Sequence, residues 1–387
     1  MFLFEKAVSG SRRYWYWILC LLAMMGLGLA CYLRQFSTGL GVTGLSRDVT
    51  WGLYISQFTF LVGVAASAVM VVLPYYLHDY KAFAKVTILG EMLAIAAVTM
   101  CMLFIFVDMG QPTRVLNVLF YPTPNSIMFW DMVSLGGYLL LNAVIALVTL
   151  HAEQKGAAPP GWIKPVILLS IPWAVSIHTV TAFLYNGLPG RSFWLTAIMA
   201  PRFLTSAFAS GPALLILLCM IIWRVSGAGF AREPIRKLSV IVTYAMLLNV
   251  FFILLEVFTA FYSQIPDHME PFEYLFFGLD GHGALVPWMW LSVLFAVVAL
   301  VLLLVPRWRA SERLLASACV LVFLSLWIDK GLGLIIGGFI PSPLGAVTEY
   351  SPTLIETGIA LGVWAVGFLM VTIFYKITLA VRESNAA

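Results

Sequence analysis

Six ionisable side chains of this sequence lie inside long apolar stretches or at their ends. They are Glu91, Asp108, Asp131, His178, Glu256 and Glu356. A charged group in hydrocarbon costs at least ~2.5–3.5 kcal/mol, so each of them needs a structural or chemical reason. Histidine and a desolvated carboxyl group exchange protons near neutral pH. The oxidation or reduction of a quinone requires such groups, because that reaction moves protons together with electrons.

Each of these side chains also has a structural interpretation, in which it caps a helix or joins two helices. Glu91 follows Gly90, where another helix can approach closely. It is therefore either a station for proton transfer or a partner in a buried helix–helix hydrogen bond. Asp329 and Lys330 are neighbours in the segment WIDKGLG and cannot share one face of a helix. We expect each of these two to find a separate partner or to reach the membrane interface.

The cysteines and histidines do not form a metal-binding pattern. Five cysteines are scattered singly, whereas iron–sulfur and structural zinc sites gather their ligands at short spacing. A haem inside the membrane usually needs two facing histidines, and only His178 is placed well within an apolar stretch. We therefore expect no intrinsic haem, iron–sulfur cluster or other metal. Electrons must then enter or leave through another polypeptide.

The elements that position these residues are membrane-spanning helices. The chain has 387 residues, of which 62% are hydrophobic and 10% charged, whereas soluble domains carry about 25% charged residues. This composition excludes a water-soluble enzyme. The net charge of +4 comes with basic residues scattered in loops, which gives no sign of nucleic-acid binding. Backbone groups in lipid must be hydrogen-bonded within their own segment, so we predict an all-α, polytopic membrane protein.

Ten apolar stretches are long enough to span a bilayer as helices, at ~20 residues each. They are 14–33, 52–77, 86–107, 126–150, 163–185, 203–224, 238–262, 286–305, 313–337 and 353–379. The first is predicted to be an uncleaved span rather than a signal peptide, because no A-x-A-like cleavage site follows it.

A weak internal repeat predicts how the spans are grouped. The second and sixth stretches carry small residues, and the third and seventh each contain one glutamate. We predict a single membrane domain over residues 1–387. It contains four-helix bundles at 52–185, which would hold the quinone site, and at 203–337, with flanking helices at 14–33 and 353–379.

The basic residues predict the orientation. With the N-terminus in the cytoplasm, sixteen of the 22 Lys and Arg residues fall on the cytoplasmic side, as the positive-inside rule requires. We therefore expect a protein of the cytoplasmic (inner) membrane with both termini in the cytoplasm. Five of the six ionisable groups then lie toward the outer face, and only Glu91 lies toward the cytoplasmic face. The outer connection 263–285 has four acidic residues and no basic one, so it is either a solvated loop or a docking surface.

Five motifs of the chain point together to a known family. They are the Trp51-Gly52 pair that opens the second stretch, D-x-G-x-P-x-R at Asp108–Arg114, N-S-x-x-x-W at Asn125–Trp130, S-x-H at Ser176–His178, and P-x-F-L-x-S-A at Pro201–Ala207. In this combination the chain resembles the polysulfide reductase membrane-subunit (NrfD/PsrC) family over most of its length. The segments GVTGLSRDVTWG and SPTLIETGIALG are most similar to the branch that serves the Dsr complex of sulfur metabolism. The membrane subunit of high-molecular-weight cytochrome complexes is a close sibling.

The resemblance implies a ten-helix subunit that binds menaquinone or ubiquinone near the outer face. Such a subunit oxidises quinol or reduces quinone as part of an oxidoreductase complex and is not a complete enzyme alone. Its implied partners are an extracytoplasmic iron–sulfur protein, a multihaem cytochrome c, and further membrane and cytoplasmic redox subunits. Proton translocation is a further expectation.

The resemblance also implies roles for individual residues. His178 and Asp108 would be the catalytic groups that exchange protons. The other expected quinone-binding residues, at the turn over the pocket and on its wall, are Gln111, Arg114, Trp130 and Asp131. The expected stations of a proton path are Glu91 and Glu256.

Two other functions stay open at this point. A secondary transporter would also contain buried carboxylates and repeats, but its sites lie near the midplane on interrupted helices. Here the ionisable groups gather toward one face instead. A purely structural anchor for extracytoplasmic redox subunits would bind no quinol.

Overall fold

The computed structural model describes residues 9–78, 80–226 and 232–386. This part of the chain is all-α, as predicted, and ten of its helical stretches are long and apolar enough to cross a membrane. They are Arg12–Thr38, Leu53–Tyr76, Val86–Asp108, Ile127–Gln154, Ile163–Asn186, Met199–Val225, Arg232–Ser263, Val286–Leu304, Glu312–Gly337 and Leu354–Val381. Each overlaps one predicted stretch, so the number and order of the spans are confirmed. Lys6, one of the basic residues used to predict the orientation, lies outside the described residues.

The spans consist of long helices, two of which are subdivided. In chain order the elements are α2 (Arg12–Thr38), α3 (Leu53–Ala65), α4 (Val69–Leu77), α5 (Ala84–Asp108), α7 (Ile127–Gln154), α8 (Ile163–Asn186), α9 (Met199–Ser226), α10 (Arg232–Ser263), α12 (Val286–Leu304), α14 (Glu312–Leu326), the π-helix η5 (Trp327–Gly333), α15 (Leu334–Gly337) and α16 (Leu354–Ala386). Short helices in the connections are η1 (Leu40–Val42), η2 (Lys81–Phe83), η3 (Pro112–Arg114), α6 (Asn117–Phe120), η4 (Ser192–Trp194), α11 (Pro266–Phe276) and α13 (Pro306–Arg309).

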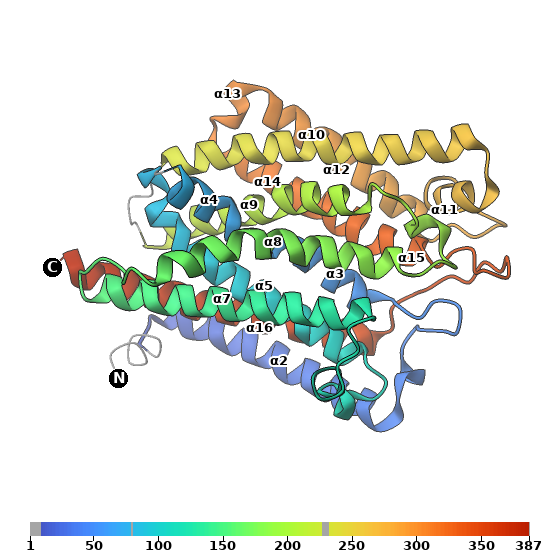
Figure 1. Cartoon of the computed structure of the whole chain (residues 1–387), viewed down its shortest axis with the longest axis horizontal. Helices are drawn as coiled ribbons and strands as arrows, with labels where there is room; N and C mark the ends of the chain where they lie inside the picture. The colour runs from blue at the N-terminus through green and yellow to red at the C-terminus, as the bar shows by residue number, and fades with distance from the viewer. Residues whose placement is uncertain (1–8, 79, 227–231, 387) are drawn as a thin grey trace.

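The long helices run side by side along the longest axis of the molecule (Figure 1). The start of α2 and the end of α16 lie at one end of this bundle, together with α4 and α13. The opposite end, named the α11 end here, carries α11, α15 and the connections 39–52, 109–126, 187–198, 264–285 and 338–353. Both termini are therefore on the same side of the membrane, as an even number of spans requires.

The interior is formed mainly by spans two, three, six and nine, which are more buried than the others. Helix α3 packs against α5 and α9; α5 also contacts α7 and α16, and α9 also contacts α8, α10 and α14. Every residue of α3 from Leu53 to Ala65 is buried. These contacts join all ten spans into one body around α3, α5 and α9. The division into two four-helix bundles stays a prediction.

Spans two and nine are irregular in ways that their sequences did not predict. In span two, the turn 66–68 separates α3 from α4. Gly90 and Gly211 pack on this turn so closely that a Cβ at Gly211 would lie 2.8 Å from the Ser67 nitrogen. In span nine, Trp327–Gly333 form a π-helix, a local irregularity that is frequent at functional sites. Interrupted spans were expected of a transporter, so their presence weakens one argument against that function.

Helices α2 and α16 pack through glycines. A Cβ on Gly28 would lie 2.6 Å from the Cα of Gly362, and a Cβ on Gly358 would lie 2.7 Å from the Sγ of Cys31. Small residues let two backbones approach in the absence of a hydrophobic driving force within lipid. The opposite face of α2 exposes large apolar side chains such as Leu22 and Leu29, which lipid would cover.

This contact predicts opposite effects for two glycines of the same helix. Gly28→Ala forces the backbones of α2 and α16 apart, and we expect a loss of about 1–3 kcal/mol, as for other overpacked cores. Gly26 has no neighbouring atom within 4 Å of its would-be Cβ. Gly26→Ala should therefore leave stability unchanged or raise it by about 0.5–1 kcal/mol. Thermal unfolding of the two purified variants in detergent checks this, and equal melting temperatures would contradict it.

Candidate functional site

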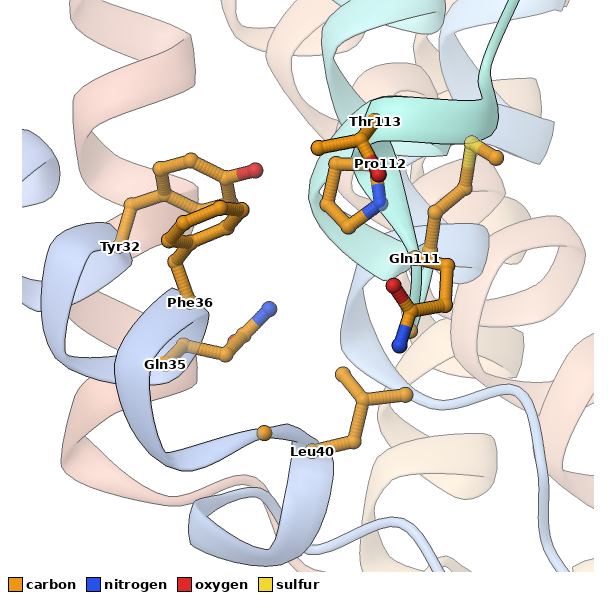
Figure 2. A pocket seen from close by; sticks show the side chains of 10 residues that line it. Tyr32, Gln35, Phe36, Leu40, Gln111, Pro112 and Thr113 are labelled. Atoms are coloured by element: carbon orange, nitrogen blue, oxygen red, sulfur yellow. The ribbon is translucent and has the colours of Figure 1, made fainter.

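A cavity of about 180 Å³ lies at the α11 end between α2 and the turn that follows α5. We call it the α2–α5 cavity. Side chains of α2 and η1 form one wall, and the turn 109–113 forms the other (Figure 2). The lining residues are Tyr32, Gln35, Phe36, Gly39, Leu40, Met109, Gly110, Gln111, Pro112 and Thr113. Two aromatic rings and a leucine thus face a turn that carries the Gln111 amide.

Gln35 connects this cavity with the protein interior. Its Nε2 donates a hydrogen bond to the carbonyl oxygen of Val107 at 2.6 Å. Its Oε1 accepts a hydrogen bond from the Tyr54 hydroxyl at 2.7 Å. The amide oxygen and the amide nitrogen of Gln35 are therefore both held by hydrogen bonds, and the side chain is almost fully buried. The three groups tie α2, α3 and α5 together beside the cavity.

Asp108 ends α5, directly before the turn that lines the cavity. Among the described residues, its buried Oδ1 has no hydrogen-bond partner. Tyr54 and Glu356 lie within range of an electrostatic interaction with it. An unpartnered carboxylate oxygen in the interior costs free energy, so a ligand or a proton at this position would stabilise it.

Glu356 is buried, and its carboxylate is fully occupied by structural contacts. It accepts hydrogen bonds from the Tyr350 hydroxyl at 2.6 Å, the Gly44 nitrogen at 2.7 Å and the Thr353 nitrogen at 2.8 Å. The Thr353 hydroxyl in turn accepts from the Glu356 nitrogen, which completes a capping box at the start of α16. Burial and the neighbouring carboxylate raise the pKa of Tyr350, so its phenol stays a donor. Glu356 therefore anchors the connection 39–52 to α16.

His178 and Asp131 lie deeper, on the facing helices α8 and α7. The Thr181 hydroxyl, one turn after His178, donates to Asp131 Oδ1 at 2.7 Å. His178 is fully buried, and neither ring nitrogen finds a hydrogen-bond partner in the described part of the chain. Its electrostatic neighbour is Lys330 of the π-helix. His178 is therefore an unpaired titratable group close to a buried cation.

Tyr185 lies between the two groups of predicted residues. Its hydroxyl is 2.5 Å from that of Thr59, and it is within electrostatic range of both Asp131 and Asp108. Tyr185 also belongs to a ring cluster with Trp51, Trp194 and Phe203. These rings cover the interior groups on the side of the α11 end. Sequence reasoning missed Tyr185, because nothing in its neighbourhood marks it as buried against carboxylates.

The other predicted quinone-site residues lie at the surface. Trp130 is 47% exposed, and its indole nitrogen donates to the Pro124 carbonyl at 2.8 Å. Arg114 is exposed in η3. Neither lines the α2–α5 cavity, whereas Gln111 does. Gln111 thus lines the cavity and Asp108 directly precedes its turn, Asp131 and His178 lie in the interior, and Trp130 and Arg114 lie on the exterior.

Glu91 lies in the half of α5 that is nearer to the chain termini and is almost completely buried. Neither carboxylate oxygen has a hydrogen-bond partner among the residues that the structure describes. Tyr76 and Tyr138 are within electrostatic range, and the turn that interrupts span two packs on the adjacent Gly90. The buried helix–helix hydrogen bond expected as the alternative role of Glu91 is thus not formed here.

Glu256 is part of a buried ion-pair cluster that sequence reasoning did not find. Arg202 of α9 donates to Glu256 Oε2 of α10 at 2.6 Å and to both oxygens of Asp329 at 3.0 and 3.1 Å. All three side chains are buried. Arg202 follows Pro201 near the start of α9, and nothing in its local sequence indicates this burial. Asp329 does find a separate partner, and Lys330 next to it is also buried within the protein.

Comparison with known proteins supplies the family context. The model of the family "Polysulphide reductase, NrfD" matches residues 41–340. The chain is 26% identical to a putative membrane subunit of dimethyl sulfoxide reductase from Halobacterium salinarum, over 93% of this chain and 89% of that protein. It is 22% identical to the Hdr-like menaquinol oxidoreductase integral membrane subunit of Archaeoglobus fulgidus, over 98% and 97%. It is 21% identical to the menaquinone reductase integral membrane subunit of Nitratidesulfovibrio vulgaris, over 94% and 91%.

Proposed function

Since the chain belongs to the polysulphide reductase NrfD family, we propose that it is the quinone-reactive integral membrane subunit of a redox complex and that the quinone head group binds in the α2–α5 cavity. The observation that carries this proposal is the position of that cavity. It combines apolar rings with a polar turn that directly follows Asp108, whose buried Oδ1 has no hydrogen-bond partner among the described residues. Two relatives named for menaquinol or menaquinone chemistry support the proposal.

The residues of the cavity suit a quinone, although the volume of about 180 Å³ is suited to the head group and not to its isoprenoid tail. Tyr32, Phe36 and Leu40 offer apolar contacts to the ring, and the Gln111 amide is the polar group at the turn. The bound quinone supplies the electron-accepting or electron-donating chemistry. Asp108 is placed to hold or release a proton at the cavity.

The interior residues have proposed roles in moving protons. His178 and Asp131 would exchange protons behind the cavity, across the Thr59–Tyr185 pair that lies between them and Asp108. Glu91 and Glu256 are the proposed stations of a path toward either face. Arg114 and Trp130 lie outside the cavity, so their proposed role is to contact the quinone tail or a partner at the surface.

The proposed partners dock at the α11 end, the predicted outer face. In this proposal an extracytoplasmic iron–sulfur protein with a multihaem cytochrome c carries electrons to or from the quinone. Helix α11 contains Asp267, Glu270 and Glu273 and is the proposed acidic part of the docking surface. The Dsr-type assignment, with a role in sulfur metabolism, rests on sequence motifs. The proposed location is the inner membrane, with both termini in the cytoplasm.

Binding of a quinol analogue to the purified chain tests the proposed cavity. A Cβ at Gly110 would lie 3.5 Å from Leu40 Cδ1, on the opposite wall, so Gly110→Leu fills the space between the walls. We expect a loss of affinity of about tenfold or more, equivalent to about 1.4 kcal/mol. Fluorescence quenching or calorimetry in detergent measures the dissociation constant.

The matched control is Gly41→Leu. Gly41 lies in the same part of the molecule, has no neighbour within 4 Å of a Cβ and does not line the cavity. The Gly41→Leu variant should bind the quinol analogue with the same affinity as the wild type. An unchanged affinity in Gly110→Leu would remove this cavity as the quinone site, and no binding by the wild type would favour the structural anchor.

A secondary transporter is a second candidate, because spans two and nine are interrupted and transporters bind their substrates at such places. Quinol-dependent reduction of an added electron acceptor by the intact complex separates the two functions. A transporter would not support this reaction.

A further inference from the structure

The buried cluster around Arg202 contains four charged groups from three elements. Arg202 of α9 bridges Glu256 of α10 and Asp329 of η5 through the hydrogen bonds given above. Lys330 follows Asp329, and its Nζ lies 3.5 Å from the Phe203 carbonyl oxygen and 4.2 Å from the centre of the Phe203 ring. All four side chains are at least nine-tenths buried.

The charges of this cluster allow two neutral arrangements. With both carboxylates ionised, Arg202 and Lys330 balance them. With Lys330 neutral, one of the carboxylates must carry a proton, because a net charge is costly in a low dielectric. The two arrangements differ only by the transfer of one proton. An N–H bond of Lys330 breaks and an O–H bond of Asp329 or Glu256 forms, and no group is oxidised or reduced.

A second cavity connects this cluster with the α11 end. It has a volume of about 200 Å³ and lies between η4, α10 and α11. Glu256 lines it together with His268 and the hydroxyl-bearing residues Thr196, Thr259 and Ser263. A cavity needs only ~10–15 Å³ of such volume per water molecule. It is therefore wide and polar enough for a chain of water to reach the Glu256 carboxylate.

Lys330 does not line this cavity, and its ammonium group lies against α3 and α9. A Cβ on Gly63 of α3 would lie 3.3 Å from Lys330 Nζ. Because glycine has no side chain, there is room for the ammonium group at this position. Other groups in electrostatic range are His178 of α8 and Cys101 of α5. The π-helix thus carries an acid that contacts Arg202 and a base that faces His178, at consecutive positions.

We propose that Glu256, Asp329 and Lys330 form a proton-exchange site that holds one transferable proton and equilibrates it with water through the cavity between η4, α10 and α11. This proton-exchange site deepens the proposed function and rests on it only for the origin of the proton. In that scheme the quinol releases a proton, and His178 passes it to Lys330. The proton then reaches the α11 end along Asp329 and Glu256.

Infrared difference spectroscopy of the full-length chain tests the proposal. A pH titration of the wild type should reveal a band of a protonated carboxyl group that Glu256→Gln or Asp329→Asn removes. The glutamine at 256 still accepts a hydrogen bond from Arg202, so the fold should persist, and thermal unfolding verifies it. If the same titrating bands remain in both variants, the proposal is overturned.

Deuterium exchange of that band tests the route. Ala260 is buried and lines the cavity, so Ala260→Phe fills the cavity without touching a titratable group. Exchange from D₂O should slow at least tenfold. The matched control, Leu254→Phe, changes the lipid-facing side of the same helix and should exchange at the wild-type rate. Wild-type exchange in Ala260→Phe would overturn the route.

Quinol-analogue binding to the same samples separates this proposal from the proposed function. Glu256→Gln should bind the analogue as tightly as the wild type, because Glu256 does not line the α2–α5 cavity. A wild-type chain that shows the titrating band but binds no analogue would refute the quinone site and keep the proton-exchange site.

Discussion

Replacing His178 by alanine is expected to reduce quinol-dependent electron transfer by about 100- to 10,000-fold, the range that general acid–base catalysis contributes. The physical reason is the isolation of its ring. His178 is fully buried, has no hydrogen-bond partner among the described residues and faces Lys330. In the described part of the chain the ring has no hydrogen bond to lose, so we expect the fold to tolerate the cavity that its removal leaves. Stopped-flow reduction of an artificial acceptor by the intact complex measures the effect.

Two further variants make this result specific. Ile177 is the buried neighbour of His178, and Ile177→Ala creates a comparable cavity while keeping the proton-exchanging group. Its turnover should stay within a few-fold of the wild type. His178→Gln keeps a polar side chain of similar size but exchanges no proton near neutral pH, so it should be as slow as His178→Ala. Normal turnover in either His178 variant would exclude this residue from the mechanism.

Replacing Arg202 by methionine is expected to be the most destabilising single change in the chain. Arg202 contacts two buried carboxylates, and its loss removes the ion-pair partner of both and leaves Lys330 as the remaining cation of the cluster. Removing one partner of a buried ion pair costs about 3–5 kcal/mol. We expect Arg202→Met to unfold at a much lower temperature or to be degraded during expression. Thermal unfolding and the yield of folded protein measure this outcome.

A triple variant distinguishes loss of charge balance from loss of packing. Arg202→Met combined with Glu256→Gln and Asp329→Asn removes three of the four charges of the cluster and leaves only Lys330, which can stay neutral there. This variant should recover most of the lost stability. Arg202→Lys should fall between the wild type and Arg202→Met, because an ammonium group lacks the forked geometry that reaches two carboxylates. If the triple variant were as unstable as Arg202→Met, the shape of the arginine rather than its charge would be the essential property.

The ten spans could be predicted because length and hydropathy are local properties of a segment. Local sequence gives no such information for Arg202, a basic residue next to a proline near the start of an apolar stretch. Whether such a residue is buried depends on which helices meet it. Only the assembled structure places Glu256 and Asp329, on two other elements, around its guanidinium group.

The candidate site was predictable in part, for the same reason. The motif at Asp108–Arg114 identified the turn that lines the α2–α5 cavity, because a turn is a local structure. The opposite wall comes from α2, whose Gln35 and Phe36 lie far away in the sequence and carry no local signal. Similarly, 66–68 interrupt span two without a glycine or proline of their own. The closely packed Gly90 and Gly211 belong to other helices.

The pairing of α2 with α16 has a consequence for biogenesis. Trp17 donates a hydrogen bond to Thr372, 355 residues further along the chain, so α2 is synthesised long before α16, the helix on which it mainly packs. At ~5–20 residues per second, synthesis of that intervening length takes on the order of 20–70 s. During this time the glycine face around Gly28 is covered only by lipid or by an insertion chaperone. Chains truncated before the last span should therefore be recognised as orphans and degraded, even though nine of their helices are complete.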